Sequence, residues 1–450
     1  MAEHPENDDP VFALATLSSD ASEQPGTPGA APEGALLRSH IEAFGFSGLE
    51  TIALAPDAPQ ALDSLFADRR LSGFLIDRFF ARAAAKRITL SPSLGHLTPR
   101  ARRSGAADLF IREGDGRLLA DDLEAGLFEA AFAKSLPNAS PCEAHAAILL
   151  DPPLGRAEAI RRERARALAQ SIRALAVRTA LLEVPADCGR KGAGGLRLPP
   201  GVDILVNASD FGVSRALEPA SACLNPQQGL PHLVVETAPR PIRTQLLLQA
   251  RSLGAAVLSG FDLEIERAKA VIEAFLGRPA RPGVCACIER DIRLEAENIV
   301  LIGMPGCGKT TIGKILAQRL MRRFVDVDEL VAQQVGKLKA RIYREEGEAF
   351  FREKETQAIR ALSLDTGLVI STGGGSCLRP VNRMLLGMNG RFIWLKRPLA
   401  KLATRDRPIA IERGVAALYE ERAPIYAALA DREIEVSSVS ETVRRILGEH

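Results

Sequence analysis

The sequence lacks the features that would place it in a membrane, in the secretory route or on nucleic acid. Its 450 residues contain no run of eighteen apolar residues, so we expect no transmembrane helix and no membrane partner. The first ten residues are polar and acidic, without the apolar core of a signal peptide. The formal net charge is only +2, which argues against a nucleic-acid binder that depends on a broad basic field.

Cysteine is also scarce, and the seven cysteines are scattered. Cys285 and Cys287 form a close pair, but no second Cys or His pair lies nearby, whereas zinc sites need four ligands at set spacings. We therefore expect no zinc site there, and a reducing, cytoplasmic location. The contents of 46% hydrophobic and 25% charged residues are typical of a soluble globular protein, and the length predicts two or three domains.

The order of apolar runs predicts an α/β protein. Residues 1–33, rich in Pro, Gly and Ser, are expected to be a loose tail with a possible first strand at 11–19. Between 34 and 277, short apolar runs alternate with helical stretches, which predicts a parallel sheet flanked by helices. The expected strands include 145–151, 179–185, 202–208, 232–238 and 255–260. Residues 278–296 break the pattern and are expected to be a linker, and 297–450 form a second α/β domain.

The second domain opens with a strand, a glycine-rich loop and a helix, which read NIVLIGMPGCGKTTIGKILAQRL (298–320). Gly303 and the segment that follows fit the phosphate-loop pattern G-x-x-x-x-G-K-[ST] in the context it requires. Lys309 would reach the β- and γ-phosphates of ATP, and the Thr310 hydroxyl would bind Mg²⁺. The predicted ATP-binding residues are Gly306, Cys307, Gly308, Lys309, Thr310 and Thr311. A glycine turn before a helix is the alternative, which the flanking strand and helix disfavour.

Several weaker patterns follow in order. Asp326 and Asp328 are two residues apart after a strand, where side chains at i and i+2 share a face of an extended chain. Arg352 and Glu355 are one helical turn apart, and TGGGS (372–376) follows another strand. Taken singly, these are also typical of a solvated strand end, a charged helix face and a flexible turn. Three arginines complete the series: Arg405, Arg407 and Arg422.

Taken together, these motifs resemble shikimate kinase over residues 297–450. The resemblance implies that Asp328 holds the substrate hydroxyls and takes a proton, and that Asp326 supports Mg²⁺ with Thr310. It implies that Arg352 and Arg422 clamp the substrate carboxylate, beside Gly373, Gly374 and Gly375. Arg407 would belong to a lid over the phosphates, with Arg405 as a helper, and would act with Lys309 and Asp328 in catalysis. The lid departs from the family at Pro408–Ala410, where leucines usually follow the proline.

The expected activity is therefore ATP- and Mg²⁺-dependent phosphorylation of the shikimate 3-hydroxyl, in the pathway to chorismate and the aromatic amino acids. Arginine suits a carboxylate because its two parallel N–H groups fix the orientation. A kinase for another hydroxylated acid, such as gluconate, and a non-enzymatic sensor are the alternatives. The strand–helix alternation of the N-terminal half disfavours a sensor with a helix-turn-helix.

Residues 34–277 resemble shikimate dehydrogenase more weakly, through 97–126, 202–212 and 241–263. The resemblance implies a Rossmann-type fold, but the family's functional positions have changed. Its catalytic lysine falls on Ala81, with Lys86 as a possible stand-in. The aspartate paired with that lysine falls on Glu124, and substrate-binding positions fall on Asp108, Asp122 and Arg267.

The nucleotide loop of that family has changed as well. Its place after the strand at 145–150 is taken by Asp151, Pro152 and Pro153, which remove N–H donors and add negative charge. The cluster KGAGG (191–195) does not follow a buried strand. We therefore expect no NADP binding and an inactive domain, with a bifunctional enzyme as the alternative. Self-association through this half is left open, and we expect the kinase to fold alone from near Ile288.

Overall fold

The structure is a computed structural model that divides into two units. It describes residues 11–17, 35–43, 49–55, 60–135, 144–150, 156–175, 177–184, 198–209, 224, 229–279, 282–402 and 414–448. The first unit comprises residues 1–240 and 249–292, and the second comprises 241–248 and 293–450. None of the helices in these ranges is long and apolar enough to cross a bilayer.

The first unit begins with a mixed six-stranded sheet in the order β2-β1-β3-β5-β6-β4. Strand β1 runs parallel to β2 and β3, so the strand expected at 11–19 lies inside the sheet rather than in a tail. Strand β5 is antiparallel to both β3 and β6. The elements are β1 (Val11–Leu17), α1 (Ala35–Ala43), β2 (Glu50–Leu54), α2 (Gln60–Ala67), β3 (Leu71–Ile76), η1 (Arg78–Phe80), α3 (Ala81–Leu90), β4 (Gly95–Leu97), α4 (Pro99–Ser104), β5 (Leu109–Arg112), β6 (Leu118–Asp121) and α5 (Leu123–Ser135).

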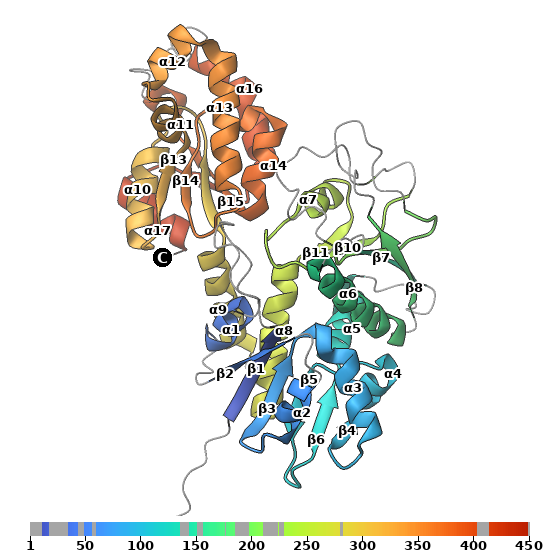
Figure 1. Cartoon of the computed structure of the whole chain (residues 1–450). Helices are drawn as coiled ribbons and strands as arrows, with labels where there is room; N and C mark the ends of the chain where they lie inside the picture. Colours follow the sequence, from blue (N-terminus) through green and yellow to red (C-terminus); the bar gives the residue numbers. More distant parts are fainter. Residues whose placement is uncertain are drawn as a thin grey trace, which may run out of the picture. The chain divides into compact units, whose positions relative to one another are not determined.

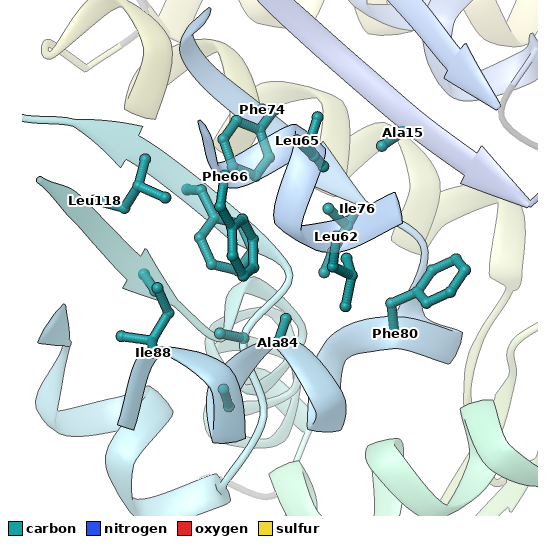
Figure 2. Close-up of a cluster of buried hydrophobic side chains, with 14 of the residues drawn as sticks. Ala15, Leu62, Leu65, Phe66, Phe74, Ile76, Phe80, Ala84, Ile88 and Leu118 are labelled. Atoms are coloured by element: carbon teal, nitrogen blue, oxygen red, sulfur yellow. The ribbon is translucent and has the colours of Figure 1, made fainter. Parts of the chain in front are cut away.

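A core of stacked aromatic rings covers one face of this sheet. Phe66, Phe74 and Phe110 are all buried, and the Phe74 and Phe110 rings stack with their centroids 4.9 Å apart. Figure 2 shows Phe66 and Phe74 beside Leu62, Leu65 and Ile88 of helices α2 and α3. Burial of such large apolar groups is the main source of stability for a sheet layer of this kind.

The second sheet of the first unit is parallel throughout, in the order β11-β10-β9-β7-β8. Its central strands are buried and mostly apolar, as is usual when helices cover both faces. The order of the strands is that of a doubly wound Rossmann-type sheet, with the switch point between β7 and β9. The elements are β7 (His145–Leu150), α6 (Arg156–Ala174), β8 (Arg178–Glu183), β9 (Ile204–Asn207), β10 (Leu233–Glu236), β11 (Ala256–Leu258) and α8 (Gly260–Leu276).

Two helices cross the division between the units: α7 (Gln245–Ser252) and α9 (Pro282–Ala296). The second lies within residues 278–296, which were predicted to be a linker, and the division between the units falls inside this helix. Pro282 is the first residue of α9, the one helical position where proline costs nothing because its missing N–H would be unpaired anyway. The proline therefore starts a helix instead of interrupting the fold.

The second unit has a parallel five-stranded sheet in the order β13-β14-β12-β15-β16. Helices α10 and α17 lie on one side of it, and α13 and α14 on the other (Figure 1). The expected fold class, α/β with a phosphate-loop domain, is confirmed. The elements are β12 (Asn298–Ile302), α10 (Lys309–Arg319), β13 (Phe324–Asp326), α11 (Val327–Val335), α12 (Lys339–Glu345), α13 (Gly347–Leu362), β14 (Val369–Ser371), η4 (Ser376–Leu378), α14 (Pro380–Asn389), β15 (Gly390–Lys396), η5 (Leu399–Lys401), α16 (Val415–Leu429), β16 (Arg432–Glu435) and α17 (Val439–Leu447).

Candidate active site

The loop between β12 and α10 has the backbone conformation that a phosphate loop needs. Gly303 and Gly308 have φ of 141° and 106°, a region that favours glycine, and a Cβ on Gly303 would lie 2.6 Å from the Leu395 carbonyl. Lys309 starts α10 and is buried, and its Nζ donates to the carbonyls of Gly303 at 2.8 Å and Met304 at 3.1 Å. The lysine is therefore folded over the loop whose N–H groups would receive the phosphates.

The two residues predicted to hold the metal lie together. Thr310 Oγ1 donates to Asp326 Oδ2 at 2.8 Å, and Ser371 Oγ lies 3.5 Å from the same hydroxyl. These are hard oxygen donors, the kind that Mg²⁺ prefers, and Mg²⁺ usually keeps several waters beside its few protein ligands. The site therefore fits Mg²⁺ bound through few protein ligands. Among the described residues, no three His, Cys, Asp or Glu side chains gather into an alternative metal cluster.

The Asp326–Asp328 pair is arranged differently from the extended chain that was expected. Strand β13 ends at Asp326, whose Oδ1 accepts from the N–H groups of Asp328 at 3.1 Å and Glu329 at 3.3 Å. This carboxylate caps α11, so Asp328 lies in the first helical turn instead of on the strand. The cap holds Asp326 toward Thr310 and leaves the two aspartates in different surroundings.

Asp328 has two carboxylate oxygens in different surroundings. Oδ2 accepts from Lys339 Nζ at 2.6 Å. Oδ1 is buried, and it has no hydrogen-bond partner among the residues that the structure describes. A Cβ on Gly373 would lie 2.5 Å from this Oδ1, so the oxygen faces the glycine loop. An acceptor oriented in this way is suited to a hydroxyl group of a ligand.

Arg352, one turn before Glu355 on α13, is held by two carboxylates. Its Nη1 donates to Glu355 Oε2 at 2.9 Å, and its Nη2 donates to Glu348 Oε1 at 3.1 Å. Burial opposes the charge of Arg352, yet the nearby Glu355 raises its pKa overall. Glu355 is fully buried and also accepts from Ser376 Oγ at 2.5 Å. The guanidinium is thus a fixed, permanently charged group.

The glycine loop after β14 brings the predicted residues to one place. A Cβ on Gly373 would meet Asp328, a Cβ on Gly375 would meet the Arg352 guanidinium, and one on Gly374 would lie 3.1 Å from Arg422 Nη1. The same Cβ on Gly374 would lie 2.7 Å from Pro305 Cγ in the phosphate loop. Only glycines permit this close approach of the substrate residues to the nucleotide loop.

Helix α16 supplies Arg422 and Tyr426 to the loop. Arg422 is buried, and its Nε has no hydrogen-bond partner within the described ranges, although Glu421 lies 3.9 Å away. Tyr426 Oη donates to the Gly374 carbonyl at 2.6 Å, and burial raises its pKa, so the phenol stays protonated. Of this pair, only Arg422 was predicted from the sequence. The structure makes Tyr426 a support for the loop.

Other predicted residues are placed as follows. Cys307 is fully buried in the phosphate loop, and its N–H donates to the Met304 carbonyl at 3.2 Å. Thr310 and Thr311 are exposed at the start of α10, and Gly306 has φ of 83°. The lid arginines Arg405 and Arg407, with Pro408–Ala410, lie outside the described residues.

In the first unit, the positions of the weaker resemblance form a buried network of charges. Arg78 Nη1 donates to Asp108 at 3.0 Å and to Asp122 at 2.8 Å, and Ser171 donates to Asp122 at 2.6 Å. Glu124 pairs with Arg267. Burial raises the pKa of Asp108, while Arg78 lowers the pKa of Asp122 in spite of burial.

The charged groups of this network pair with one another and with the backbone of the first unit. Arg78 comes from η1 and also donates to the Ala167 carbonyl of α6 at 3.1 Å. Ala81 is buried, and Lys86 is exposed on α3. Residues 151–155, where the cofactor loop was predicted to be lost, and the glycine cluster at 191–195 lie outside the described residues.

Comparison with known proteins assigns the second unit to a family. The family model for shikimate kinase matches residues 305–449. Shikimate kinase of Aromatoleum aromaticum is 39% identical over 142 residues, which are 30% of this chain and 81% of that protein. The chain belongs to the shikimate kinase family. Asp328, Arg352 and Arg422, which Gly373–Gly375 bring together, are among the residues that carry the family motifs.

Solved structures align with each part of this shikimate kinase family member. Shikimate kinase from Acinetobacter baumannii in complex with shikimate covers 34% of this chain and 91% of its own, at 32% identity and TM-score 0.33. Shikimate dehydrogenase from Aquifex aeolicus covers 63% of this chain and 99% of its own, at 13% identity and TM-score 0.42.

Proposed function

We propose that the second unit transfers the γ-phosphoryl group of ATP to the 3-hydroxyl of shikimate. The observation that carries the proposal is the glycine loop: Gly374 contacts the phosphate loop at Pro305, while its neighbours contact Asp328 and Arg352. The acceptor for a hydroxyl, the clamp for a carboxylate and the cradle for phosphates therefore lie around one loop. Phosphoryl transfer needs mainly this kind of alignment together with positive charge.

The reaction assigns a role to each group. The substrate carboxylate binds Arg352 and Arg422, and a ring hydroxyl donates to Asp328 Oδ1, which takes its proton as the oxygen attacks the γ-phosphorus. The bond from that phosphorus to the bridging oxygen breaks, and ADP leaves. Lys309 turns from the loop carbonyls to the transferring phosphate, and Arg407 of the lid adds charge there. Mg²⁺, held by Thr310 and Asp326, would neutralise phosphate charge when bound.

The proposal is tested by ADP release with and without shikimate. Lys309→Ala should lower turnover by on the order of 10²–10³, because a preorganised charge at the transferring group is lost. Lys314→Ala is the matched control, since Lys314 is exposed on the same helix. Unchanged turnover in Lys309→Ala would refute the site, and a greater kcat/KM for gluconate than for shikimate would refute the substrate.

We also propose that the first unit has no dehydrogenase activity and no tight NADP site. The proposal is supported by the self-paired charges of Arg78, Asp108 and Asp122 in place of neutral substrate-binding groups. Calorimetry should detect no NADP binding in the micromolar range, and shikimate should not reduce NADP. Oxidation of shikimate that Glu124→Ala abolishes would instead establish a bifunctional enzyme.

We also propose that the protein is cytoplasmic. Fractionation of cells would test this location.

A further inference from the structure

Besides Arg352 and Arg422, a third cation lies beside the proposed substrate residue Asp328. This cation, Lys339, belongs to none of the sequence motifs. Lys339 is the first residue of α12, and its Nζ donates to Asp328 Oδ2 at 2.6 Å. Its side chain is 41% exposed and that of Asp328 is 29% exposed, so the pair borders solvent rather than the protein core. A ligand that reaches Asp328 therefore also reaches the ammonium group.

Lys339 shares an aromatic wall with the proposed carboxylate clamp. Its Nζ lies 5.0 Å from the centroid of the Phe351 ring and 5.9 Å from that of Tyr343. Arg352 Cζ lies 5.8 Å from the same Phe351 ring. Because Phe351 is fully buried, its ring is a fixed support, and it holds Lys339 and Arg352 against the same wall.

The hydrogen-bonding capacity of the pair is only partly used. An ammonium group has three donors, and Asp328 is the hydrogen-bond partner of Lys339 within the described part of the chain. Asp328 Oδ1, buried and facing Gly373, has no partner there either. The pair thus offers one acceptor and up to two donors side by side. Two adjacent hydroxyls on a ring, one donating and one accepting, complement this arrangement.

We infer that Lys339 is a substrate-binding residue that selects for a second ring hydroxyl. Asp328 accepts from the hydroxyl that is phosphorylated, and Lys339 donates to the oxygen of a neighbouring hydroxyl. This assignment rests on the proposed function, because it takes Asp328 as the group that receives the reacting hydroxyl. It makes discrimination among hydroxylated carboxylic acids a property of Lys339 and Asp328 together, with Arg352 and Arg422 reading only the carboxylate.

The first test replaces Lys339 by Met, which keeps an unbranched stem against the Phe351 and Tyr343 rings. We expect the KM for shikimate to rise at least about tenfold, the usual effect of losing a hydrogen bond to a charged group, with the KM for ATP unchanged. Lys339→Arg should recover part of the loss. The matched control is Lys337→Met, which removes an ammonium that pairs with Glu345 and Glu346 outside the site and should leave both KM values unchanged.

The second test changes the substrate. Shikimate analogues that lack the 4- or the 5-hydroxyl should each be assayed with the wild-type chain and with Lys339→Met. For one analogue, kcat/KM of the wild-type chain should fall about tenfold relative to shikimate. For Lys339→Met it should fall little, because this variant already lacks the ammonium group that binds the missing hydroxyl.

Each outcome bears on a different statement. A wild-type chain without shikimate-dependent ADP release overturns the proposed function and this inference with it. If the wild-type chain is active, an unchanged KM in Lys339→Met overturns the inference alone. A lower KM in that variant does so too, because Lys339 would then compete with substrate for Asp328. Equal losses on both analogues in both proteins would likewise exclude contact between Lys339 and a hydroxyl.

Discussion

Arg352 combines a fixed position with a charge that neighbouring carboxylates stabilise. Glu355 and Glu348 take three of its N–H contacts and hold the guanidinium plane beside Gly375. A lysine at this position has a single point charge, which cannot both pair with the buried Glu355 and bind a carboxylate through two parallel hydrogen bonds. The position therefore requires arginine, and exchange for lysine is not conservative here.

Arg352→Lys should raise the KM for shikimate at least about tenfold and leave the KM for ATP unchanged. Steady-state kinetics with each substrate varied in turn would measure this. Arg341→Lys is the control, because Arg341 forms an exposed ion pair with Glu345 on the neighbouring helix. If Arg352→Lys affected ATP alone, the assignment of Arg352 to the substrate side would be wrong.

Residues within motifs could be predicted from the sequence, and residues outside them could not. Thr310 and Asp326 were expected to share a metal, and they lie within 2.8 Å. Lys339 gave no such signal, because a single lysine at the start of a helix is usually solvated. Its contact with Asp328 depends on how α11 and α12 pack together, which local sequence does not encode. Asp326 as a helix cap was missed because its strand was expected to continue.

Among the elements, the glycine loop at residues 373–375 is the one that has no space for side chains. At Gly373 the nearest atoms to an added Cβ are Asp328 Oδ1 at 2.5 Å and Glu355 Oε1 at 2.9 Å. Both carboxylates are held by other groups, Lys339 and Arg352, so neither can move without breaking an ion pair. The conflict is steric, and it lies directly at the proposed acceptor.

Gly373→Ala should therefore reduce kcat/KM for shikimate by at least about tenfold and lower the free energy of unfolding by about 1–3 kcal/mol, as is usual for overpacking. Kinetics and thermal unfolding would measure the two effects. Gly114→Ala, at a glycine with no atom within 4 Å of an added Cβ, is the control and should be close to neutral. A fully active Gly373→Ala would show that the loop adopts another conformation.

The packing of α8 against α1 buries a carboxyl group. Burial raises the pKa of Glu264 from 4.5 to about 7, against the opposing charge of Arg240 and a hydrogen bond from the Leu37 backbone. Between these two pKa values the unfolded chain has lost the proton while the folded chain keeps it. The free energy of unfolding therefore falls as pH rises through this window. Burial also lowers the pKa of His40 to about 4, with a smaller contribution from Arg240, which gives the opposite slope up to about pH 6.5.

Glu264→Gln should remove the fall in the free energy of unfolding with rising pH that Glu264 causes, and it should leave the pH dependence that His40 causes. Relative to wild type, the variant should gain up to about 3 kcal/mol at pH 8 and little at pH 5, because only the ionised wild-type group carries the cost. Thermal unfolding at the two pH values would measure the difference. Glu266 is exposed on the same helix, and Glu266→Gln is the control. Its free energy of unfolding should differ from that of wild type by the same amount at pH 5 and at pH 8. An equal gain of Glu264→Gln at pH 5 and pH 8 would contradict the assignment.

The strands could be predicted because continuous apolar runs are typical of buried parallel strands, as in β7 and β12. Helix α9 could not, because two nearby prolines resemble a linker and only the position of Pro282 at the first turn reconciles it with a helix. Whether Pro282 interrupts a helix or starts one depends on where the helix begins, and the local sequence pattern does not determine that residue.

At the scale of the whole chain, a short segment of the N-terminal half belongs to the kinase unit. Residues 241–248 are part of the second unit, although residues 240 and 249 belong to the first. The Ile242 N–H donates to Asn389 Oδ1 at 2.8 Å, and the Arg243 N–H donates to the Met388 carbonyl at 2.8 Å. The Arg243 guanidinium donates to the carbonyls of Gly387 and Gly390 and pairs with Glu297. No motif predicts such contacts, because their partners are about 50 to 150 residues away.

This segment changes what is expected of a kinase expressed alone. A chain that starts near Ile288 should fold and phosphorylate shikimate, because the site residues all lie from residue 303 onward. It should be less stable than the same unit in the full chain, since the buried Asn389 and Glu297 lose partners, each at a cost of about 1–3 kcal/mol. Arg243→Met in the full chain should reproduce part of this loss, and Arg251→Met, at the end of α7, is the control.

Thermal unfolding, kinetics and solution mass of the truncated and full chains decide between three readings of the N-terminal half. Lower stability with unchanged kcat, restored by a peptide of residues 238–252, would show that the half supplies a structural segment to the kinase. A change in solution mass would show that it mediates self-association. A truncated kinase that folds but has no activity at any shikimate concentration would mean that the N-terminal half completes the active site. The separation into two functional modules would then be wrong, since catalysis would need residues from both.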